Sequence, residues 1–394
     1  MHASTTFWTL KMADSVVLFG SCNRQNMPQH HWDIMLQNHG NIDAFLWLGD
    51  SVYPANHSIN ALSAAYTNLT NNVNYTKFID KVGVIDGILD DHDFGVNDGG
   101  RTVDSIEKRR NLFKNFINFY QKTDSFISTD VLYHSTKLLS NINVIFLDTR
   151  TYRDDHYIKS IGNFHFPFTA LIAAAVRGLC SVLKLGSSYN GDVLGELQWK
   201  WLENELKVSD SDFNIIVSSI QIMTSNPMVE SWGHFPNSKE RLFNLIKQYN
   251  PRGLLFLSGD VHHSEISTVK KYVNNNESIG SIAEITSSGL THHCGDVLCP
   301  LMLSVFNGHR KSFSDYYIGR NYGVINKLNE SALNISIHSL HNHKAKLSYV
   351  LHRGSRLESI NLITYSKFPT IYDTFFLPFV ILICTIIFFC KFKK

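Results

Sequence analysis

Short apolar runs alternate with amphipathic stretches over most of the chain. The runs are bounded by turn residues and predict buried strands at residues 16–19, 44–48, 87–89, 144–147, 215–218 and 254–257. Apolar residues at helical spacing predict amphipathic helices at residues 27–38, 106–121, 194–206 and 239–248. A late antiparallel part is expected from residues 282–286 through 349–350. The alternation favours an α/β layered domain.

Residues 161–188 interrupt this alternation between two predicted elements. Within them, residues 164–176 are mostly apolar. The segment has three interpretations: a lid, a membrane-facing patch or an ordinary core helix. We favour the core helix, since apolar helices in globular proteins are usually buried.

Composition and charge limit the class of protein. A chain of 394 residues with 44% hydrophobic and 18% charged residues can bury a large core. The net charge of +2 gives no general basic field, so nucleic acid is not an expected partner, and no pattern indicates an obligate protein partner. Six cysteines give no disulfide framework, but Cys294 and Cys299 could close a small loop in an oxidising compartment.

The C-terminal end has a different composition from the rest of the chain. Residues 375–390 carry no charged side chain, and the apolar segment beginning at residue 371 has about 20 residues, enough for one bilayer crossing. Three lysines follow, which places this end in the cytosol. We therefore predict a domain at residues 1–368, one transmembrane helix at 371–390 and a short basic tail at 391–394. A buried core helix and a cleaved lipid-anchor signal are the alternatives.

The predicted orientation puts the domain in the lumen or outside the cell, as a single-pass membrane protein. Six glycosylation sequons, several of them in polar Asn-rich segments that we interpret as loops, agree with this location. Residues 1–11, however, lack the form of a signal peptide. Either the natural start lies upstream, which we favour, or the protein is tail-anchored with a cytosolic domain.

Two predicted strands end in a Gly-Asp pair that a possible metal ligand follows within three residues. The side chains are Asp50 with Tyr53, and Asp260 with His262. Glycine lets the chain turn sharply, so each carboxylate emerges at the carboxyl edge of the sheet. Open α/β sheets hold ligands at that edge.

A third chemical cluster follows the predicted strand at residues 87–89. Residues 90–98 contain four acids and one histidine, which would repel one another without cations. A solvated acidic turn is the alternative. Together with Asp50 and Asp260, the cluster favours a metal site.

These motifs resemble those of metallophosphatases. Gly49-Asp50-x-x-Tyr53 resembles an element of purple acid phosphatases, and residues 91–93 and 259–262 stand where metallophosphatases have Asn-His-Asp or Asn-His-Glu and Gly-His-x-His. With Gly20-Ser21-Cys22, the set resembles the PhoD-like alkaline phosphatase family of the calcineurin-like superfamily. Further matches lie at residues 147–153, 194–202, 218–221 and 231–236. The motifs at residues 93–98 and 232–236 are closer to the eukaryotic branch.

The resemblance implies two packed β-sheets flanked by helices, with iron(III) and calcium or another divalent metal at one end. A thiolate from Cys22 and a phenolate from Tyr53 suit iron, whereas carboxylate and amide oxygens suit calcium. In this family pattern Asp50 bridges the two metals and Asp91 binds the second. The remaining expected ligands are Asn97, Asp260 and His262.

The same resemblance implies in-line hydrolysis of a phosphate ester by metal-activated water. His92 is expected to protonate the leaving group or stabilise the phosphoryl group. Arg150 either binds phosphate in a bidentate manner or pairs with a core acid. Trp232 and His234 either line the substrate mouth or pack in the core. A loop with His292 and His293 is a further candidate for this mouth.

Three functions are therefore considered. The first, which we favour, is a membrane-anchored metal-dependent phosphatase acting on phosphate mono- or diesters. The second is a phosphodiesterase for lipid or glycolipid head groups, which the apolar C-terminal segment suggests. The third is a displayed binding protein on a catalytically dead scaffold, but such a protein would have lost some of the metal ligands.

Overall fold

The structure is a computed structural model. It describes residues 15–118, 131–139, 141–158, 169–186, 188–224, 226–273, 276–295, 299–300, 303 and 315–353. The transmembrane helix predicted at residues 371–390 and the basic tail lie outside the described residues. Of the helices that are described, none combines the length and the apolar character needed to cross a bilayer.

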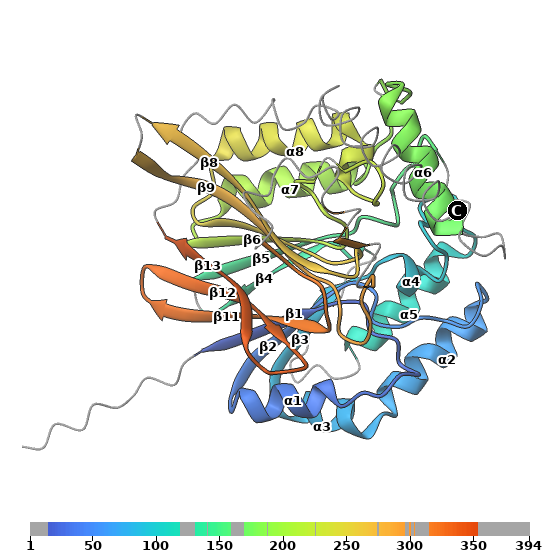
Figure 1. Ribbon diagram of the computed structural model, residues 1–394, viewed down its shortest axis with the longest axis vertical. Helices are drawn as coiled ribbons and strands as arrows, with labels where there is room; N and C mark the ends of the chain where they lie inside the picture. The colour runs from blue at the N-terminus through green and yellow to red at the C-terminus, as the bar shows by residue number, and fades with distance from the viewer. Residues whose placement is uncertain are drawn as a thin grey trace, which may run out of the picture.

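Two sheets form the centre of the molecule (Figure 1). The first has the strand order β13-β12-β11-β1-β2-β3 and the second has the order β10-β8-β9-β7-β6-β5-β4. Strands of the first sheet are β1 (Val16–Gly20), β2 (Ile42–Leu48), β3 (Val82–Ile88), β11 (Asn321–Asn329), β12 (Ala332–Ser339) and β13 (Ala345–His352). Strands of the second are β4 (His134–Leu138), β5 (Ile142–Leu147), β6 (Phe213–Ser218), β7 (Leu254–Ser258), β8 (Ser264–Val273), β9 (Asn276–Ser287) and β10 (Tyr316–Tyr317).

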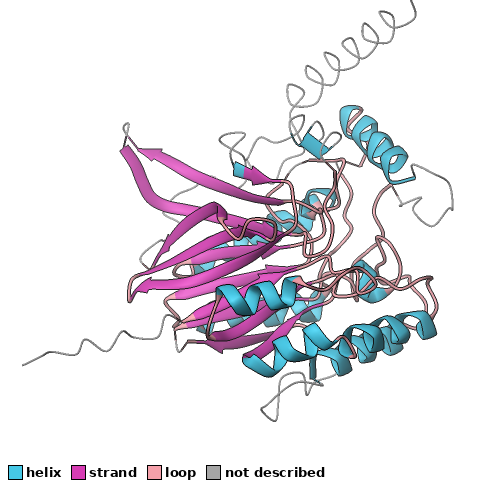
Figure 2. Ribbon diagram, turned by 60° about the horizontal axis from the view of Figure 1, so that its bottom comes forward, coloured by secondary structure: helices cyan, strands magenta, loops and turns pink. Residues whose placement is uncertain are grey.

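Helices lie outside the two sheets, as Figures 1 and 2 show. In Figure 1, α1 (His31–Asn38), α2 (Ile59–Thr70) and α3 (Val73–Lys81) lie on the side of the first sheet, and α7 (Glu196–Val208) and α8 (Pro236–Tyr249) lie on the side of the second. The other described helices are α4 (Asp91–Phe94), α5 (Ile106–Asn118), α6 (Thr169–Val182) and the 3-10 helix η1 (Trp232–His234).

Alternate residues of the central strands pack on opposite faces, and both faces are buried. In β5, Val144 and Phe146 belong to the core between the sheets, whereas Ile145 and Leu147 pack with Trp199 of α7. A strand that is covered on both faces needs a continuous apolar run, which is the pattern seen in the sequence. The six predicted strands and the two packed sheets flanked by helices are confirmed.

Two glycines bring loops from different strands into close contact. Gly49 has φ +98°, and a Cβ atom added there would lie 2.5 Å from the Asp90 Cβ. A Cβ atom on Gly259 would lie 2.8 Å from the Leu48 carbonyl oxygen. Both Gly-Asp turns therefore need glycine, the first for its backbone conformation and both for close approach. The contacts draw the loops after β2, β3 and β7 together at one edge.

Helices α2 and α3 cover most of the Asn-rich stretch from residue 59 to residue 76, so its interpretation as glycosylation loops was wrong for two sequons. Asn68 lies in α2 and Asn74 lies in α3. The Ser58 hydroxyl accepts a hydrogen bond from the Ala61 amide, and the Asn72 side chain accepts from two amides at the start of α3. These polar residues act as helix N-caps.

Residues 161–188 contain α6, and its burial contradicts the core-helix interpretation. Its buried side chains include Ala174 and Arg177, whereas Ile172 and Leu179 are 47% and 58% exposed. The helix thus presents an apolar face outward. Residues 161–168 and 187, in the same segment, lie outside the described residues.

Candidate metal centre

The loops that follow parallel strands carry most of the chemistry. The carboxyl ends of these strands meet at the same edge of the structure. Strands β1, β2 and β3 run parallel in one sheet, and β5, β6, β7 and β9 run parallel in the other. The side chains that reach this edge are Cys22 after β1, Asp50 and Tyr53 after β2, Asp90, Asp91 and His92 after β3, and Asp260 and His262 after β7.

A first set of donors surrounds one Asp50 oxygen. The Tyr53 hydroxyl is 2.7 Å from Asp50 Oδ2 and 3.2 Å from His262 Nε2. The Cys22 sulfur is 3.6 Å from the same Asp50 oxygen. Ligand atoms of Cys22, Asp50 and His262 all lie within 4.8 Å of one another, which is close enough for one metal ion.

A second set of donors consists of carboxylates. Ligand atoms of Asp90, Asp91 and Asp260 lie within 4.8 Å of one another, and so do those of Asp50, Asp91 and His92. Asp50 therefore belongs to the first set and also lies close to Asp91, a member of the second. Asp90 Oδ2 and Asp91 Oδ1 are buried and have no hydrogen-bond partner among the described residues. Orphaned buried oxygens of this kind fit a cation, since they are costly without one.

The electrostatics of the cluster also fit bound cations. Burial, with the nearby carboxylates adding to it, raises the pKa of Asp50 and Asp260 well above the usual aspartate range. Burial also raises the pKa of the Cys22 thiol to about 12. A metal ion would reverse these shifts, because it favours the deprotonated ligands.

Four of the candidate ligands have a left-handed backbone. The φ angles are +62° for Cys22, +52° for Asp50, +69° for Asp260 and +58° for His262. This conformation is uncommon for residues other than glycine and tends to collect at functional sites. The loops are therefore held in shapes that aim these side chains at one another.

Asp93 clamps two of these loops instead of offering itself as a ligand. Its carboxylate accepts hydrogen bonds from the Ser51 amide at 3.1 Å, the Asp90 amide at 3.0 Å and the Tyr66 hydroxyl at 3.1 Å. Ser51 follows Asp50, so the clamp fixes the Asp50 loop against the loop of the second donor set.

Two histidines border the centre. The His92 amide donates to Asp50 Oδ1 at 3.2 Å, and its half-buried ring lies 4.0 Å from the Tyr53 ring, centre to centre. The His292 ring is 4.4 Å from that of His262. His293, by contrast, accepts a hydrogen bond from the Gly295 amide, and His263 lies 3.8 Å from Glu265.

Arg150 is a buried ion-pair partner, so its expected role in substrate binding needs correction. Its Nε donates to Asp90 Oδ1 at 2.6 Å, and its two terminal nitrogens donate to Glu230 at 2.8 and 3.0 Å. The side chain is fully buried. Of the two interpretations from the sequence, the structure shows the ion pair with core acids.

The structure decides between the two interpretations of Trp232. Trp232 is fully buried, donates to the Ser218 hydroxyl at 3.0 Å and packs edge-on against Trp199. It is a core residue and does not line a substrate mouth. The Asn97 amide donates to Asp98 at 3.1 Å, and its expected role as a metal ligand stays a prediction.

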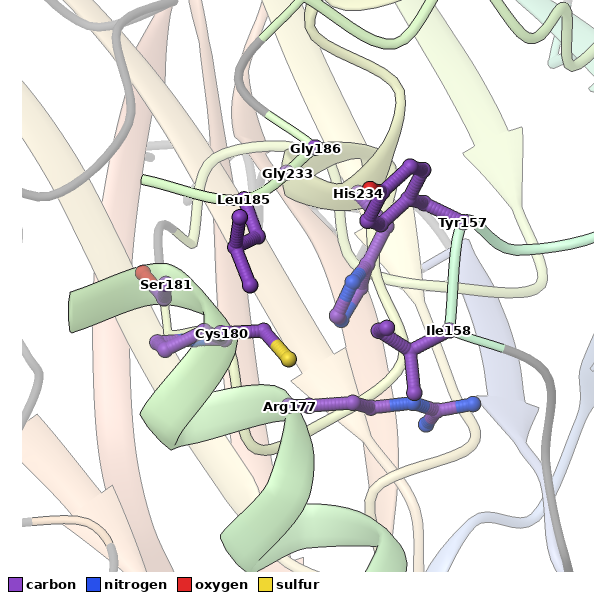
Figure 3. Close-up of a pocket in the computed structure, with 10 residues that line it drawn as sticks. Tyr157, Ile158, Arg177, Cys180, Ser181, Leu185, Gly186, Gly233 and His234 are labelled. Atoms are coloured by element: carbon purple, nitrogen blue, oxygen red, sulfur yellow. The ribbon is translucent and has the colours of Figure 1, made fainter. Parts of the chain in front are cut away.

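His234 lines a pocket beside the metal centre (Figure 3). The His234 ring and the Cys180 sulfur face the same space, with Arg177 crossing beneath it. Arg177 pairs with Asp98 at 2.5 Å, and the Asp98 amide donates to Asp91 Oδ2 at 2.7 Å. This chain of contacts connects the pocket to the second donor set.

Sequence reasoning missed Ser288 and Glu230. The Ser288 hydroxyl lies 3.0 Å from the Cys22 sulfur and accepts from the His262 amide at 2.7 Å. Its position directly after β9, at the same edge as the other loops, is a signal that could have identified it. Glu230 lies in a loop after β6 and had no such signal.

Two comparisons of the sequence name the same family. Residues 114–298 match the family model described as PhoD-like phosphatase. The chain is also 30% identical to alkaline phosphatase D of Bacillus subtilis (strain 168) over 139 residues, which are 33% of this chain and 21% of that protein. This chain thus matches only about a fifth of the length of the curated relative.

Two solved structures have a similar fold. A structure of PhoD matches with a TM-score of 0.63 at 18% identity, over 89% of this chain and 72% of that one. The purple acid phosphatase PPD1 from yellow lupin (Lupinus luteus) seeds matches with a TM-score of 0.53 at 12% identity, over 86% and 54%. The assignment to a eukaryotic branch stays a prediction. Over residues 114–298 the chain is similar to PhoD-like phosphatases.

Proposed function

We propose that this protein is a metal-dependent phosphatase that hydrolyses phosphate mono- or diesters with metal-activated water. The observation that carries the proposal is the shared position of Asp50. One of its oxygens contacts Tyr53 and Cys22, and Asp50 also has a ligand atom within 4.8 Å of one of Asp91, a member of the carboxylate set. A carboxylate between two donor sets suits a two-metal hydrolase.

The donor types suggest which metals the two sets hold. Cys22, Tyr53 and His262 offer sulfur, phenol and imidazole, and the first two suit iron(III). Asp90, Asp91 and Asp260 offer only oxygen, which suits calcium or another divalent ion. Bound at these positions, the metals would activate a water molecule and neutralise charge on the phosphate.

His92 supplies a hydrogen-bond donor beside the metals. Burial lowers its pKa from 6.5, so the ring is neutral at neutral pH and carries one proton on nitrogen. A neutral imidazole can donate that proton in a hydrogen bond to the phosphoryl group or the leaving oxygen. The hydrogen bond from its amide to Asp50 holds the residue at this position.

Metal analysis and turnover of the purified full chain test the proposal. We expect bound iron together with a second metal, and hydrolysis of p-nitrophenyl phosphate or bis-p-nitrophenyl phosphate that a chelator abolishes. Restoring iron and calcium should restore turnover. A folded chain that stays inactive after both metals are restored would refute the proposal and favour the displayed binding protein.

A phosphodiesterase for lipid or glycolipid head groups is the second candidate. The exposed apolar face of α6 favours it, because Val176 and Leu179 lie on the same helix as the pocket residues Arg177 and Cys180. Vesicles that contain a phosphodiester lipid should then be hydrolysed faster than the soluble diester. Equal or slower hydrolysis of the vesicles would exclude this specialisation.

Membrane attachment with a lumenal or extracellular domain is part of the proposal. It is supported by the largely apolar segment at residues 371–390 of the sequence and by the disulfide between Cys294 and Cys299, a bond typical of oxidising compartments. Asn56, in one of the sequons, is exposed. Cells expressing the full chain should yield a carbonate-resistant protein whose gel mobility changes with glycosidase. A carbonate-soluble protein without a mobility change would contradict this location.

A further inference from the structure

The backbone of Arg24 is held in place at the border of the metal centre. It lies two residues after Cys22, in the loop that follows β1. Its amide donates to the Thr291 hydroxyl at 2.8 Å, and its carbonyl accepts from the Gln29 side chain at 2.9 Å. These contacts hold the backbone on both sides of the side chain.

The guanidinium of Arg24 extends over a candidate metal ligand. Its central carbon lies 5.1 Å from the centre of the Tyr53 ring, within the range of a cation–π contact. The residue is exposed to solvent. Burial lowers the pKa of His292 to about 4, and the positive charge of Arg24 contributes to this shift. Arg24 therefore acts electrostatically on a side chain that borders the metal centre.

Other arginines near the centre are already committed to acids. Arg150 pairs with Asp90 and Glu230, and Arg177 pairs with Asp98. Within the part of the chain that the structure describes, no carboxylate lies within ion-pair distance of Arg24. Its planar set of donors is therefore available to an anion.

We propose that Arg24 binds the phosphate group of the substrate and favours monoesters over diesters. The inference rests on the proposed phosphatase function. At neutral or alkaline pH a phosphate monoester carries two negative charges and three terminal oxygens, whereas a diester carries one charge and two terminal oxygens. A cation beside the metals therefore stabilises a bound monoester more than a bound diester. The monoester also has a third terminal oxygen, which can accept from Arg24 while the metals bind the other two.

Arg24→Gln and Arg24→Lys test this role in the full chain. Arg241→Gln is a matched control, because Arg241 also lies over an aromatic ring, Trp199 at 4.7 Å, but on α8 and away from the metal centre. The measurements are metal content, binding of inorganic phosphate to the metal-loaded protein by calorimetry, and kcat and KM for a chromogenic monoester and diester.

We expect Arg24→Gln to weaken phosphate binding about 10- to 100-fold with metal content unchanged, as for loss of hydrogen bonds to a charged group. The monoester-to-diester ratio of kcat/KM should fall about tenfold. Arg24→Lys should lie between the wild type and Arg24→Gln, because lysine keeps the charge but not the fork of donors. Arg241→Gln should match the wild type.

Three outcomes would overturn the inference. If Arg24→Gln binds phosphate as the wild type does while the wild type hydrolyses esters, the role of Arg24 fails and the phosphatase function stands. If Arg24→Gln loses metal, Arg24 supports the Tyr53 and Cys22 ligands and does not bind phosphate. If the metal-loaded wild type neither binds phosphate nor hydrolyses either ester, the proposed function itself fails.

Discussion

The buried pairing of Arg150 with Asp90 and Glu230 predicts a large loss of stability when the arginine charge is removed. Arg150→Met keeps much of the side-chain volume but takes the cation away from two buried acids. Asp90 loses its arginine partner, and Glu230 keeps only Arg153 at 3.3 Å and His156 at 2.7 Å. Side-chain exposure is 0% for Arg150 and Asp90 and 3% for Glu230. Solvent therefore cannot screen the uncompensated charges.

The size of the loss in unfolding free energy follows from the burial of this ion pair. Removing one partner of a buried ion pair costs about 3–5 kcal/mol. With an unfolding entropy of about 2.1 cal/mol/K per residue, a chain of 394 residues has about 0.8 kcal/mol/K. The melting temperature of Arg150→Met should therefore fall by about 4–6 °C.

Thermal unfolding of the full chain after chelator treatment is the assay, because a bound metal would itself compensate Asp90. The double variant Arg150→Met with Glu230→Gln is the matched control, because it removes one of the two acids that lose the guanidinium. It should be more stable than Arg150→Met alone, which a simple loss of arginine packing would not produce.

The opposite pattern would refute this role of Arg150. If Arg150→Met melts within about 1 °C of the wild type while its KM for a phosphate monoester rises tenfold or more, the arginine contacts substrate. The ion pair seen in the structure would then be a resting arrangement that opens when substrate binds.

Three further predictions concern the metal ligands and one buried acid. Asp50→Asn should lower the content of both metals and abolish turnover. The control Asp210→Asn, at an exposed surface position, should do neither. Full metal content in Asp50→Asn would exclude Asp50 as a shared ligand. Tyr53→Phe should remove the visible phenolate-to-iron absorption band from a folded protein, and an unchanged spectrum would show that Tyr53 is not an iron ligand. Burial raises the pKa of Glu284 from 4.5 to about 7, so its contribution to stability is complete below pH 4.5 and is lost as the pH rises to about 7. Glu284→Gln should remove that fall, which urea unfolding at several pH values measures, and a stability curve of unchanged slope would contradict the shift.

The central strands could be predicted because their burial leaves a direct pattern. Residues 144–147 and 254–257 are covered on both faces, so every position is apolar and the run stands out. Helices α2 and α3 were not predicted, although the residues that they bury, such as Leu62, Ala65, Tyr66 and Leu69 of α2, are apolar and have helical spacing. The Asn and Thr residues between these positions suggested loops instead. The starting points of the two helices depend on Ser58 and Asn72, residues that are as common in turns as at helix N-caps.

The role of Arg150 was open in the sequence for a different reason. Asp90 lies 60 residues before it and Glu230 lies 80 residues after it. A residue that follows a strand at the ligand-binding edge can reach either the substrate or a neighbouring loop. Whether Arg150 binds substrate or pairs with an acid depends on the path of the loop that carries Glu230. The local sequence pattern does not specify that path.

The acidic cluster shows where local patterns stop being informative. Asp90, Asp91 and Asp93 are chemically identical and adjacent in the sequence, yet Asp93 is the clamp and the other two have orphaned oxygens. The short helix α4 separates them, because Asp90 occupies its N-cap and Asp93 turns back to accept from the Asp90 amide. The sheet edge thus determines that acids gather there, whereas the turn of α4 determines which of them is left to bind a metal.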